Sequence, residues 1–199
     1  MGGRFPHADE FLMFNRPSIG AAEEEAVLEV LRSGWLTTGL RTKALEERFA
    51  AFRGCTHAVG TNSCTAALHL CLLCLGVGPG DEVITSPITF ASTANVIVHC
   101  GATPVFCDVA DDTLNMDPES MGRVITPRTK AIIAVHFAGH PCDMDEIDAI
   151  AARHGVPVIE DAAHAVEAEY RGRPTGSLGR VAAFSFYATK NITSGRAGC

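Results

Sequence analysis

The regular alternation of strand-like and helix-like segments is the feature that most limits how this chain can fold. In the C-terminal three quarters, short apolar runs predict strands at 57–60, 81–85, 103–108, 129–137, 157–161 and 181–186. Between them, apolar residues at helical spacing predict helices at 63–75, 90–100, 117–125 and 143–154. Parallel strands require helical crossovers and bury both faces of their sheet. The alternation therefore predicts an α/β fold with three layers, α/β/α, around a mostly parallel sheet.

The N-terminal part of the chain lacks this alternation. Prolines break any regular pattern at its start, and acidic residues then favour a helix over 20–33. A second helix is predicted to begin at a Thr42 cap. Because no repeat or low-complexity linker divides the chain, we expect one domain over 1–199, with a helical segment at about 1–54 and an α/β core at about 55–199.

Composition and charge exclude several classes of function. The chain has 199 residues, of which 20% are charged, with a net charge of −7 and a pI near 5.6. An acidic chain without clusters of Lys or Arg is not expected to bind nucleic acid or a membrane surface. No stretch has the pattern of a secretion signal or of a membrane span, so we expect a cytoplasmic protein.

The spacing of cysteines and histidines favours packing over chemistry. Cys71, Cys74, Cys100 and Cys107 lie in apolar runs, where reduced core thiols are expected. Cys71 and Cys74 have the spacing of a redox motif, but they lie inside a predicted helix without the usual preceding strand. The eight histidines are scattered and have no ligand spacing, so no metal site is expected.

A polar segment follows the predicted strand 57–60 and opens the next helix. Its sequence over 60–68 is GTNSCTAAL. In parallel sheets, ligands bind beyond the carboxyl ends of the strands, and unpaired amides at a helix N-terminus attract phosphate. Ser63 and Thr65 add hydroxyl donors, so the segment predicts either a phosphate site or a plain serine cap.

Two further positions follow predicted strands. Asp161 ends an apolar strand, where a carboxylate would hold a pyridine nitrogen protonated, with Ala163 and His164 beside the ring. The alternative for Asp161 is helix capping. Phe90 comes shortly after the strand 81–85, where it would either stack on an aromatic cofactor or be buried at a helix start.

The last predicted strand, 181–186, carries Ser185 and leads to Lys190 in a polar loop. Burial near the end of a strand lowers the pKa of a lysine and makes its amine a usable nucleophile. Such an amine forms a Schiff base with a carbonyl cofactor such as pyridoxal 5′-phosphate (PLP). The alternative is a solvated lysine without a chemical role.

The order and local sequences of these segments match a known pattern. The matching segments are 16–20 (RPSIG), 33–39 (SGWLTTG), 60–68 (GTNSCTAAL), 78–84 (GPGDEVI), 101–105 (GATPV), 159–163 (IEDAA), 176–179 (GSLG) and 184–191 (FSFYATKN). The chain resembles, nearly end to end, the DegT/DnrJ/EryC1/StrS family of PLP-dependent sugar aminotransferases. The resemblance implies the aspartate-aminotransferase (type I) fold, of which this chain would form the PLP-binding major domain.

The resemblance also implies which residues hold and use PLP. They are Cys64, Thr65, Phe90, Asp161, His164, Ser185 and Lys190. Lys190 would be the catalytic lysine, which attaches the cofactor covalently and acts as general acid and base. Asp161 would pair with the pyridine nitrogen, and Phe90 would stack on the ring.

At the other end of the cofactor, the resemblance implies that Cys64, Thr65 and Ser185 hold the phosphate, and that His164 lies near the ring oxygen. Family members typically transfer an amino group, commonly from glutamate, to a keto carbon of a nucleotide-linked deoxysugar. Their products enter surface polysaccharides, lipopolysaccharide or glycosylated antibiotics. A homodimer is expected for the full-length form.

Three other functions are compatible with parts of the pattern. A sugar 3-dehydratase of the same superfamily uses a related cofactor, but it characteristically has histidine in place of the lysine, so Lys190 favours transamination. A flavodoxin-like binding protein without PLP would not require the ordered set of segments. A non-catalytic relative or truncated product is the third alternative.

Two departures from the family pattern favour that third alternative. After Lys190 the family usually continues NxTxGEGG, whereas residues 191–199 are NITSGRAGC. The chain then ends at roughly half the length that the family needs. We therefore expect an N-terminal fragment from which the C-terminal small domain is absent.

Overall fold

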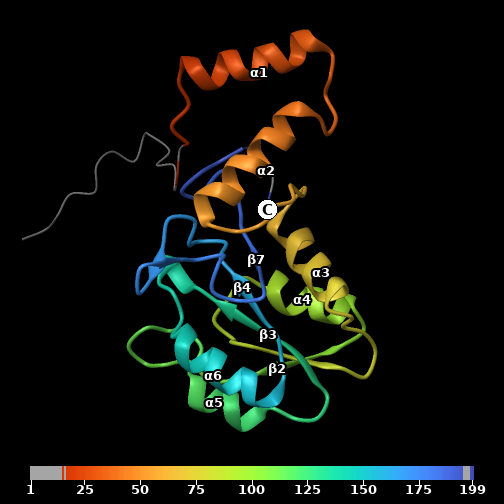
Figure 1. Ribbon diagram of the computed structural model, residues 1–199, viewed down its shortest axis with the longest axis vertical. Helices are drawn as coiled ribbons and strands as arrows, with labels where there is room; N and C mark the ends of the chain where they lie inside the picture. The colour runs from red at the N-terminus through yellow and green to blue at the C-terminus, as the bar shows by residue number, and fades with distance from the viewer. Residues whose placement is uncertain (1–14, 16, 195–197) are drawn as a thin grey trace, which may run out of the picture.

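The computed structural model describes residues 15, 17–194 and 198–199 of the chain (Figure 1). Residues 1–14, Arg16 of the first matching segment and Arg196 of the departure from the family pattern lie outside the described residues. Of the helices in the described part, none is long and apolar enough to cross a membrane.

Among the described residues, five strands form one parallel sheet in the order β2-β1-β3-β4-β7. The strands are β1 (Glu82–Thr85), β2 (Thr103–Phe106), β3 (Thr129–Val135), β4 (Val158–Asp161) and β7 (Val181–Ala183). Every residue of β1 and β4, near the centre of the sheet, is buried. Burial on both faces explains why these strands are continuous apolar runs in the sequence. The predicted mostly parallel sheet is confirmed.

Helices cover both faces of the sheet. They are α3 (Cys64–Cys74), α4 (Ser92–His99), α5 (Pro118–Val124) and α6 (Met144–His154). Figure 1 shows α3 and α4 on one face and α5 and α6 on the other. Because side chains alternate along a strand, Ile133 of β3 packs in the cluster with α3 and α4, whereas its neighbour Ile132 packs with α5 and α6. The predicted three-layer α/β/α fold is confirmed.

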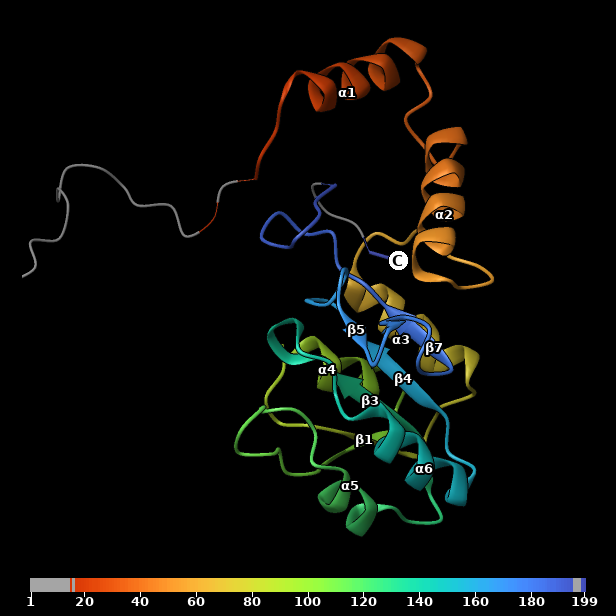
Figure 2. The same ribbon diagram turned by 60° about the vertical axis from the view of Figure 1, so that its left-hand side comes forward.

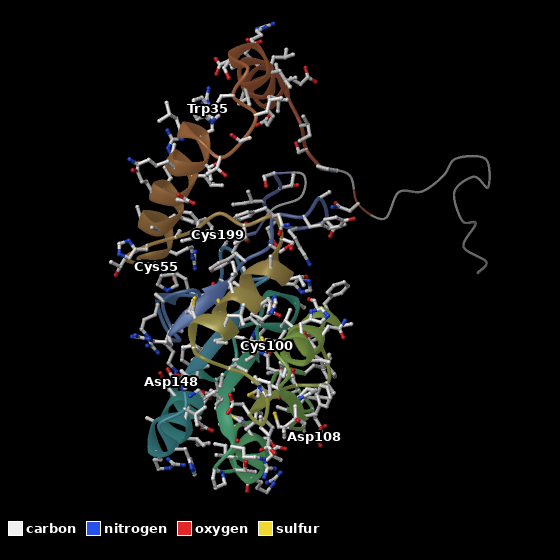
Figure 3. The ribbon with its side chains drawn as sticks, turned by 90° about the vertical axis from the view of Figure 1, so that its right-hand side faces the viewer. Trp35, Cys55, Cys100, Asp108, Asp148 and Cys199 are labelled. Carbon is white, nitrogen blue, oxygen red and sulfur yellow. The ribbon has the colours of Figure 1, made fainter. Side chains whose placement is uncertain are left out.

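The two N-terminal helices, α1 (Ala21–Ser33) and α2 (Leu40–Arg53), project from one end of this body (Figures 1 and 2). No residue of α1 is buried against the described part of the chain. Trp35, between the two helices, is 65% exposed and lies far from the sheet (Figure 3). At the other end of α2, the Phe49 ring packs edge-on against Phe184 and Phe186, with ring centroids 4.9 and 5.3 Å away. These contacts fix α2, and not α1, to the core.

Some predicted boundaries are wrong by a few residues. The second helix begins at Leu40 with Gly39 as its N-cap, so the predicted Thr42 cap lies inside the first turn. The helix predicted over 90–100 is shorter, because its regular hydrogen bonding begins only at Ser92. Helix ends are set by backbone geometry that local sequence patterns fix only approximately.

The prediction of a strand at 57–60 is wrong. A strand requires a hydrogen-bonded neighbour, and within the described residues this part of the chain has one antiparallel bridge, between Thr61 and Gly198. Gly198 also bridges Ser185, so it lies between the two segments. β7 likewise ends at Ala183, three residues before the predicted end, because its pairing with β4 stops there and Ser185 has only the single bridge to Gly198.

Two short elements have no counterpart in the predicted pattern. One is an antiparallel pair, β5 (Glu169–Tyr170) and β6 (Arg173–Pro174), and the other is a single 3-10 turn, η1 (Phe137–Gly139). The 3-10 turn follows β3, and its Phe137 lines the cavity described below, whereas the β5–β6 pair lies in the connection from β4 to β7.

Candidate active site

A cavity of about 700 Å³ opens at the carboxyl edge of the parallel sheet. Residues from the ends of β3 and β4, the segments that follow β1 and β7, and the start of α3 form its walls. Ligands of open α/β sheets bind at this edge. The cavity is lined by all seven residues predicted to bind a cofactor: Cys64, Thr65, Phe90, Asp161, His164, Ser185 and Lys190.

The start of α3 supplies one polar end of the cavity. Ser63 is the N-cap of the helix, and its Oγ accepts a hydrogen bond from the amide of Ala66 at 3.1 Å. The amides of Cys64 and Thr65 have no partner within the described part of the chain, and both residues line the cavity. Free amides at the positive end of a helix dipole attract an anion. The serine cap is confirmed. The backbone of Gly198 lies against the Cys64 amide, where an added Cβ would come within 2.4 Å of the nitrogen, so the cap leaves these two donors between the cavity and the Gly198 backbone.

Asp161 ends β4 on the side of the sheet that faces α3 and α4. Its buried carboxyl group accepts two hydrogen bonds, from the Thr93 hydroxyl to Oδ2 at 2.8 Å and from the Ala163 amide to Oδ1 at 3.3 Å. Burial raises the pKa of Asp161, and the hydrogen bond from Thr93 opposes this rise. The elements described between β4 and β7 are strands, so Asp161 caps no helix and that alternative is wrong.

Lys190 lies half-buried in the loop after β7 and lines the cavity. Removal from water lowers the pKa of its amine, whereas the nearby Cys64 and Asp161 raise it. Because the net pKa is lowered, a larger fraction of the amine is neutral and nucleophilic at a given pH. Lys190 therefore differs from the solvated lysine of the alternative interpretation.

Two rings lie at the cavity wall. Phe90 is 77% exposed although it is apolar, and it lines the cavity, so the alternative of a buried core residue is wrong. Partial burial lowers the pKa of His164, and the charge of Lys190 lowers it further, so its imidazole is mainly neutral near pH 7. The carbonyl of His164 lies against Gly139, where a Cβ would come within 2.9 Å of the oxygen. With a φ of 84° as well, this position requires glycine.

These features allow a comparison with known proteins. The model of the DegT/DnrJ/EryC1/StrS aminotransferase family matches residues 17–199. The chain belongs to this family. Among curated relatives, the spore coat polysaccharide biosynthesis protein SpsC of Bacillus subtilis is 56% identical over 190 residues, which are 96% of this chain and 49% of SpsC. The chain thus spans about half the length of the curated relatives it matches.

Solved structures agree with the family assignment. The aminotransferase from Psychrobacter cryohalolentis matches with a TM-score of 0.90 at 43% identity, over 92% of this chain and 47% of that one. Spr1654 from Streptococcus pneumoniae, in its PLP form, matches with a TM-score of 0.91 at 40% identity, over 94% of this chain and 52% of that one. Its PMP form matches with a TM-score of 0.92. The fold is that of PLP-dependent aminotransferases, and PLP is the cofactor of the DegT/DnrJ/EryC1/StrS family.

The cavity residues fit this cofactor. The free amides of α3 suit its phosphate, the buried Asp161 suits a protonated ring nitrogen, and the half-buried amine of Lys190 suits its carbonyl carbon. The exposed face of Phe90 offers a stacking surface for its ring. The phosphate, the ring nitrogen, the carbonyl carbon and the ring face of PLP would therefore each find a suitable group in the same cavity.

Sequence patterns did not reveal a second buried carboxylate next to the cavity. The Oε2 atom of Glu160 lies 3.0 Å from Nε2 of His136, and neither side chain is exposed. Because Nδ1 of His136 accepts the amide of Cys142 at 3.2 Å, the ring proton lies on Nε2 and is donated to Glu160. Burial by itself would raise the pKa of Glu160, but its hydrogen bonds lower it overall. The other donors are the amides of Gly176, Leu178 and Gly179.

The cavity is also lined by residues that were not among the predicted site residues. Thr89, His136, Phe137 and Tyr187 line it because turns after β1, β3 and β7 bring them to the sheet edge. Within the described residues, no group of three or more His, Cys, Asp or Glu side chains could hold a metal ion.

Proposed function

We propose that this chain forms the cofactor-binding part of a PLP-dependent aminotransferase that acts on a nucleotide-linked keto-deoxysugar, with glutamate as the amino donor. One observation carries this proposal. The free amides at the start of α3, the Asp161 carboxyl group and the Lys190 amine come from distant parts of the sequence and line one cavity.

Two side chains would handle protons in this reaction. When bound, PLP supplies a ring that withdraws electrons from the reacting carbon of the substrate. Asp161 would hold a proton at the ring nitrogen through a charged hydrogen bond. Lys190 would remove a proton from the reacting carbon with its neutral Nζ and then return it as an ammonium group. Its lowered pKa favours the neutral form that the first step needs.

The remaining predicted residues would bind and orient the cofactor. The amides of Cys64 and Thr65 would donate to the phosphate, with the hydroxyl groups of Thr65 and Ser185 as further donors. Phe90 would stack on the ring and keep water from one of its faces. His164, neutral near pH 7, would donate to or accept from the ring oxygen.

The substrate class rests on the family and on a relative's name. SpsC is described as a protein of spore coat polysaccharide biosynthesis, which supports a sugar substrate and a product that enters a polysaccharide. The nucleotide linkage and the glutamate donor follow the pattern typical of the family. A homodimer for the full-length form and a cytoplasmic location belong to the same proposal and rest on the sequence alone.

Covalent trapping of PLP tests the site directly. The chain has three lysines, Lys43, Lys130 and Lys190, so each candidate position can be followed by mass spectrometry after reduction with borohydride. We expect one pyridoxyl group per chain, on Lys190, and its loss in Lys190→Ala. Lys43→Ala is the matched control, because the side chain of Lys43 is 71% exposed, and it should leave the label on Lys190. Equal labelling of all three lysines, or none, would contradict the proposed site.

The amino donor is tested in the same preparation before reduction. L-Glutamate should convert the bound cofactor to its amino form and release one 2-oxoglutarate per labelled site, whereas D-glutamate should not. Specific labelling of Lys190 without this conversion would support the non-catalytic alternative.

A further inference from the structure

Two threonine hydroxyl groups connect the cavity wall to the buried Asp161. Thr93 is fully buried, and its Oγ1 donates to Asp161 Oδ2 at 2.8 Å. Oγ1 of Thr89, which lines the cavity, lies 2.8 Å from Oγ1 of Thr93. Both threonines belong to the segment that leads from β1 into α4, so this segment carries the two-threonine chain from Thr89 to the carboxylate.

Proton counting ties the direction of these hydrogen bonds to the protonation state of Asp161. Each hydroxyl group has one proton, and an ionised carboxylate can only accept. If Asp161 is ionised, Thr93 spends its proton on Asp161, and Thr89 must then donate to Thr93. If Asp161 carries a proton on Oδ2, both hydrogen bonds can reverse. In the ionised state Thr93 is the donor to Asp161 and the acceptor from Thr89, so its hydroxyl group is satisfied on both sides.

We propose that Thr93, supported by Thr89, is a positioning residue that keeps the Asp161 carboxylate ionised and fixes its orientation in the cavity. The consequence at the ring nitrogen of PLP rests on the proposed function, because only an ionised carboxylate can stabilise a protonated pyridine nitrogen. The effect on Asp161 itself does not need the cofactor.

The surroundings of Asp161 show why a dedicated donor matters. Burial opposes the ionised form, and Thr93 is the strongest influence in favour of it. The charged or titratable groups that face this carboxylate are His136, His164, Lys190 and Cys64. His136 and His164 also favour the ionised form, each less than Thr93 does. The ring nitrogens of His136 are engaged by Glu160 and by the Cys142 amide, so this ring does not replace the Thr93 donor. Thr93 also lies in the first turn of α4, whose dipole favours a negative charge.

The test is a pH titration of the Asp161 side-chain carboxyl carbon by NMR in the cofactor-free chain. Thr93→Val removes the hydroxyl group and keeps the shape, whereas Thr93→Ser keeps the hydroxyl group; Asp161→Asn assigns the signal. Hydrogen bonds to a charged group have strengths that correspond to about one to two pH units. We therefore expect the Asp161 midpoint to rise by this amount in Thr93→Val and to stay at the wild-type value in Thr93→Ser.

A second variant keeps the test decisive if Thr93→Val does not fold, which circular dichroism would show. Thr89→Val removes only the supporting donor, from a partly exposed position, and should raise the midpoint by less than half as much. An unchanged midpoint in Thr93→Val, or equal rises in Thr93→Val and Thr93→Ser, overturns the proposal. If Thr93→Val is unfolded, an unchanged midpoint in Thr89→Val overturns it.

Labelling of Lys190 with PLP separates this proposal from the proposed function. A midpoint shift in a chain that does not bind PLP would support the role of Thr93 and contradict the cofactor site. Normal labelling of Lys190 with no midpoint shift in Thr93→Val would support the cofactor site and overturn the proposed role of Thr93. Where both hold, the absorbance of bound PLP should change with pH over a shifted range in Thr93→Val, and the wild-type range should return in Thr93→Ser.

Discussion

Two neighbouring acids at the end of β4 have opposite environments. Val158 packs with α5 and α6 and Ile159 with α3 and α4, so alternation along the strand directs Glu160 to the first side and Asp161 to the second. Glu160 accepts from three backbone amides and His136, which lower its pKa in spite of its burial. Asp161 accepts hydrogen bonds from one hydroxyl group and, at the longer distance of 3.3 Å, from one amide, and its pKa is raised.

The difference separates a structural carboxylate from a functional one. A buried charge surrounded by donors stabilises the fold, because every lone pair that lost water has gained a partner. Glu160 fits this description, and its amide donors hold the 176–179 turn against the sheet. A buried charge with few donors costs stability, and it persists where a ligand supplies the missing partner. Asp161, on the cavity wall, fits the second description.

The largest expected effect separates the two acids by activity. Asp161→Asn removes the charge at the cavity, so the glutamate half-reaction should fall by at least about a hundredfold, as expected for loss of a group that controls a proton. The free energy of unfolding should change by less than about 1 kcal/mol, since the amide oxygen still accepts from Thr93. Stopped-flow absorbance and urea unfolding measure the two effects. A large loss of stability with normal activity would reverse the assignment.

The next effect concerns stability. Glu160→Gln places an NH₂ group among backbone donors and removes a buried charge partner, so the free energy of unfolding should fall by about 3 kcal/mol. Urea unfolding followed by fluorescence or circular dichroism measures the loss. Glu167→Gln, at an exposed position, is the matched control and should change stability by less than about 0.5 kcal/mol. Equal effects of the two substitutions would show that the donors around Glu160 do not stabilise the fold.

The pH dependence of unfolding sharpens the comparison, because the two acids should act with opposite sign. The folded-state pKa of Glu160 lies below its usual value of 4.5, so its contribution is present above that pH and is lost as the pH falls through the lowered pKa. The folded-state pKa of Asp161 lies above 3.8, so its contribution is present below that pH and is lost as the pH rises through the raised pKa.

Urea unfolding measured at several pH values between about 3 and 7 tests this sign difference, because this range includes the ordinary pKa values of Asp and Glu. Glu160→Gln should flatten the acid limb of the stability curve, and Asp161→Asn should gain stability relative to the wild type as the pH rises. Parallel curves for the two variants would contradict the opposite pKa shifts.

The same strand shows how far the sequence predicts this molecule. The buried run that ends in Asp161 is visible in the sequence, and with it the parallel sheet, the edge where the cavity opens and seven of the residues that line it. The sequence gives no sign of which donors surround each carboxylate. The amides that bind Glu160 come from the turn at 176–179, and the Thr93 hydroxyl group comes from α4, so both sets of donors depend on tertiary placement.

The failed prediction at 57–60 has a related cause. Its local pattern is strand-like, but strand formation depends on a neighbouring strand, and the described chain supplies it with a single bridge at Thr61. Local periodicity therefore predicts strands such as β1 to β4, each of which pairs along its length with another predicted strand. It does not predict elements whose partner is determined by distant segments.

The smallest expected effect tests whether acidity alone explains the behaviour of Glu160. Asp148 of α6 lies near the Glu160 side of the sheet, is only partly buried and has its pKa raised, first by burial (Figure 3). Because it lacks the surrounding amides that Glu160 has, Asp148→Asn should change the free energy of unfolding by less than about 0.5 kcal/mol, toward greater stability at neutral pH. Urea unfolding at pH 7 measures this. A loss comparable to that of Glu160→Gln would mean that negative charge on this face, and not the set of donors around one carboxylate, stabilises the fold.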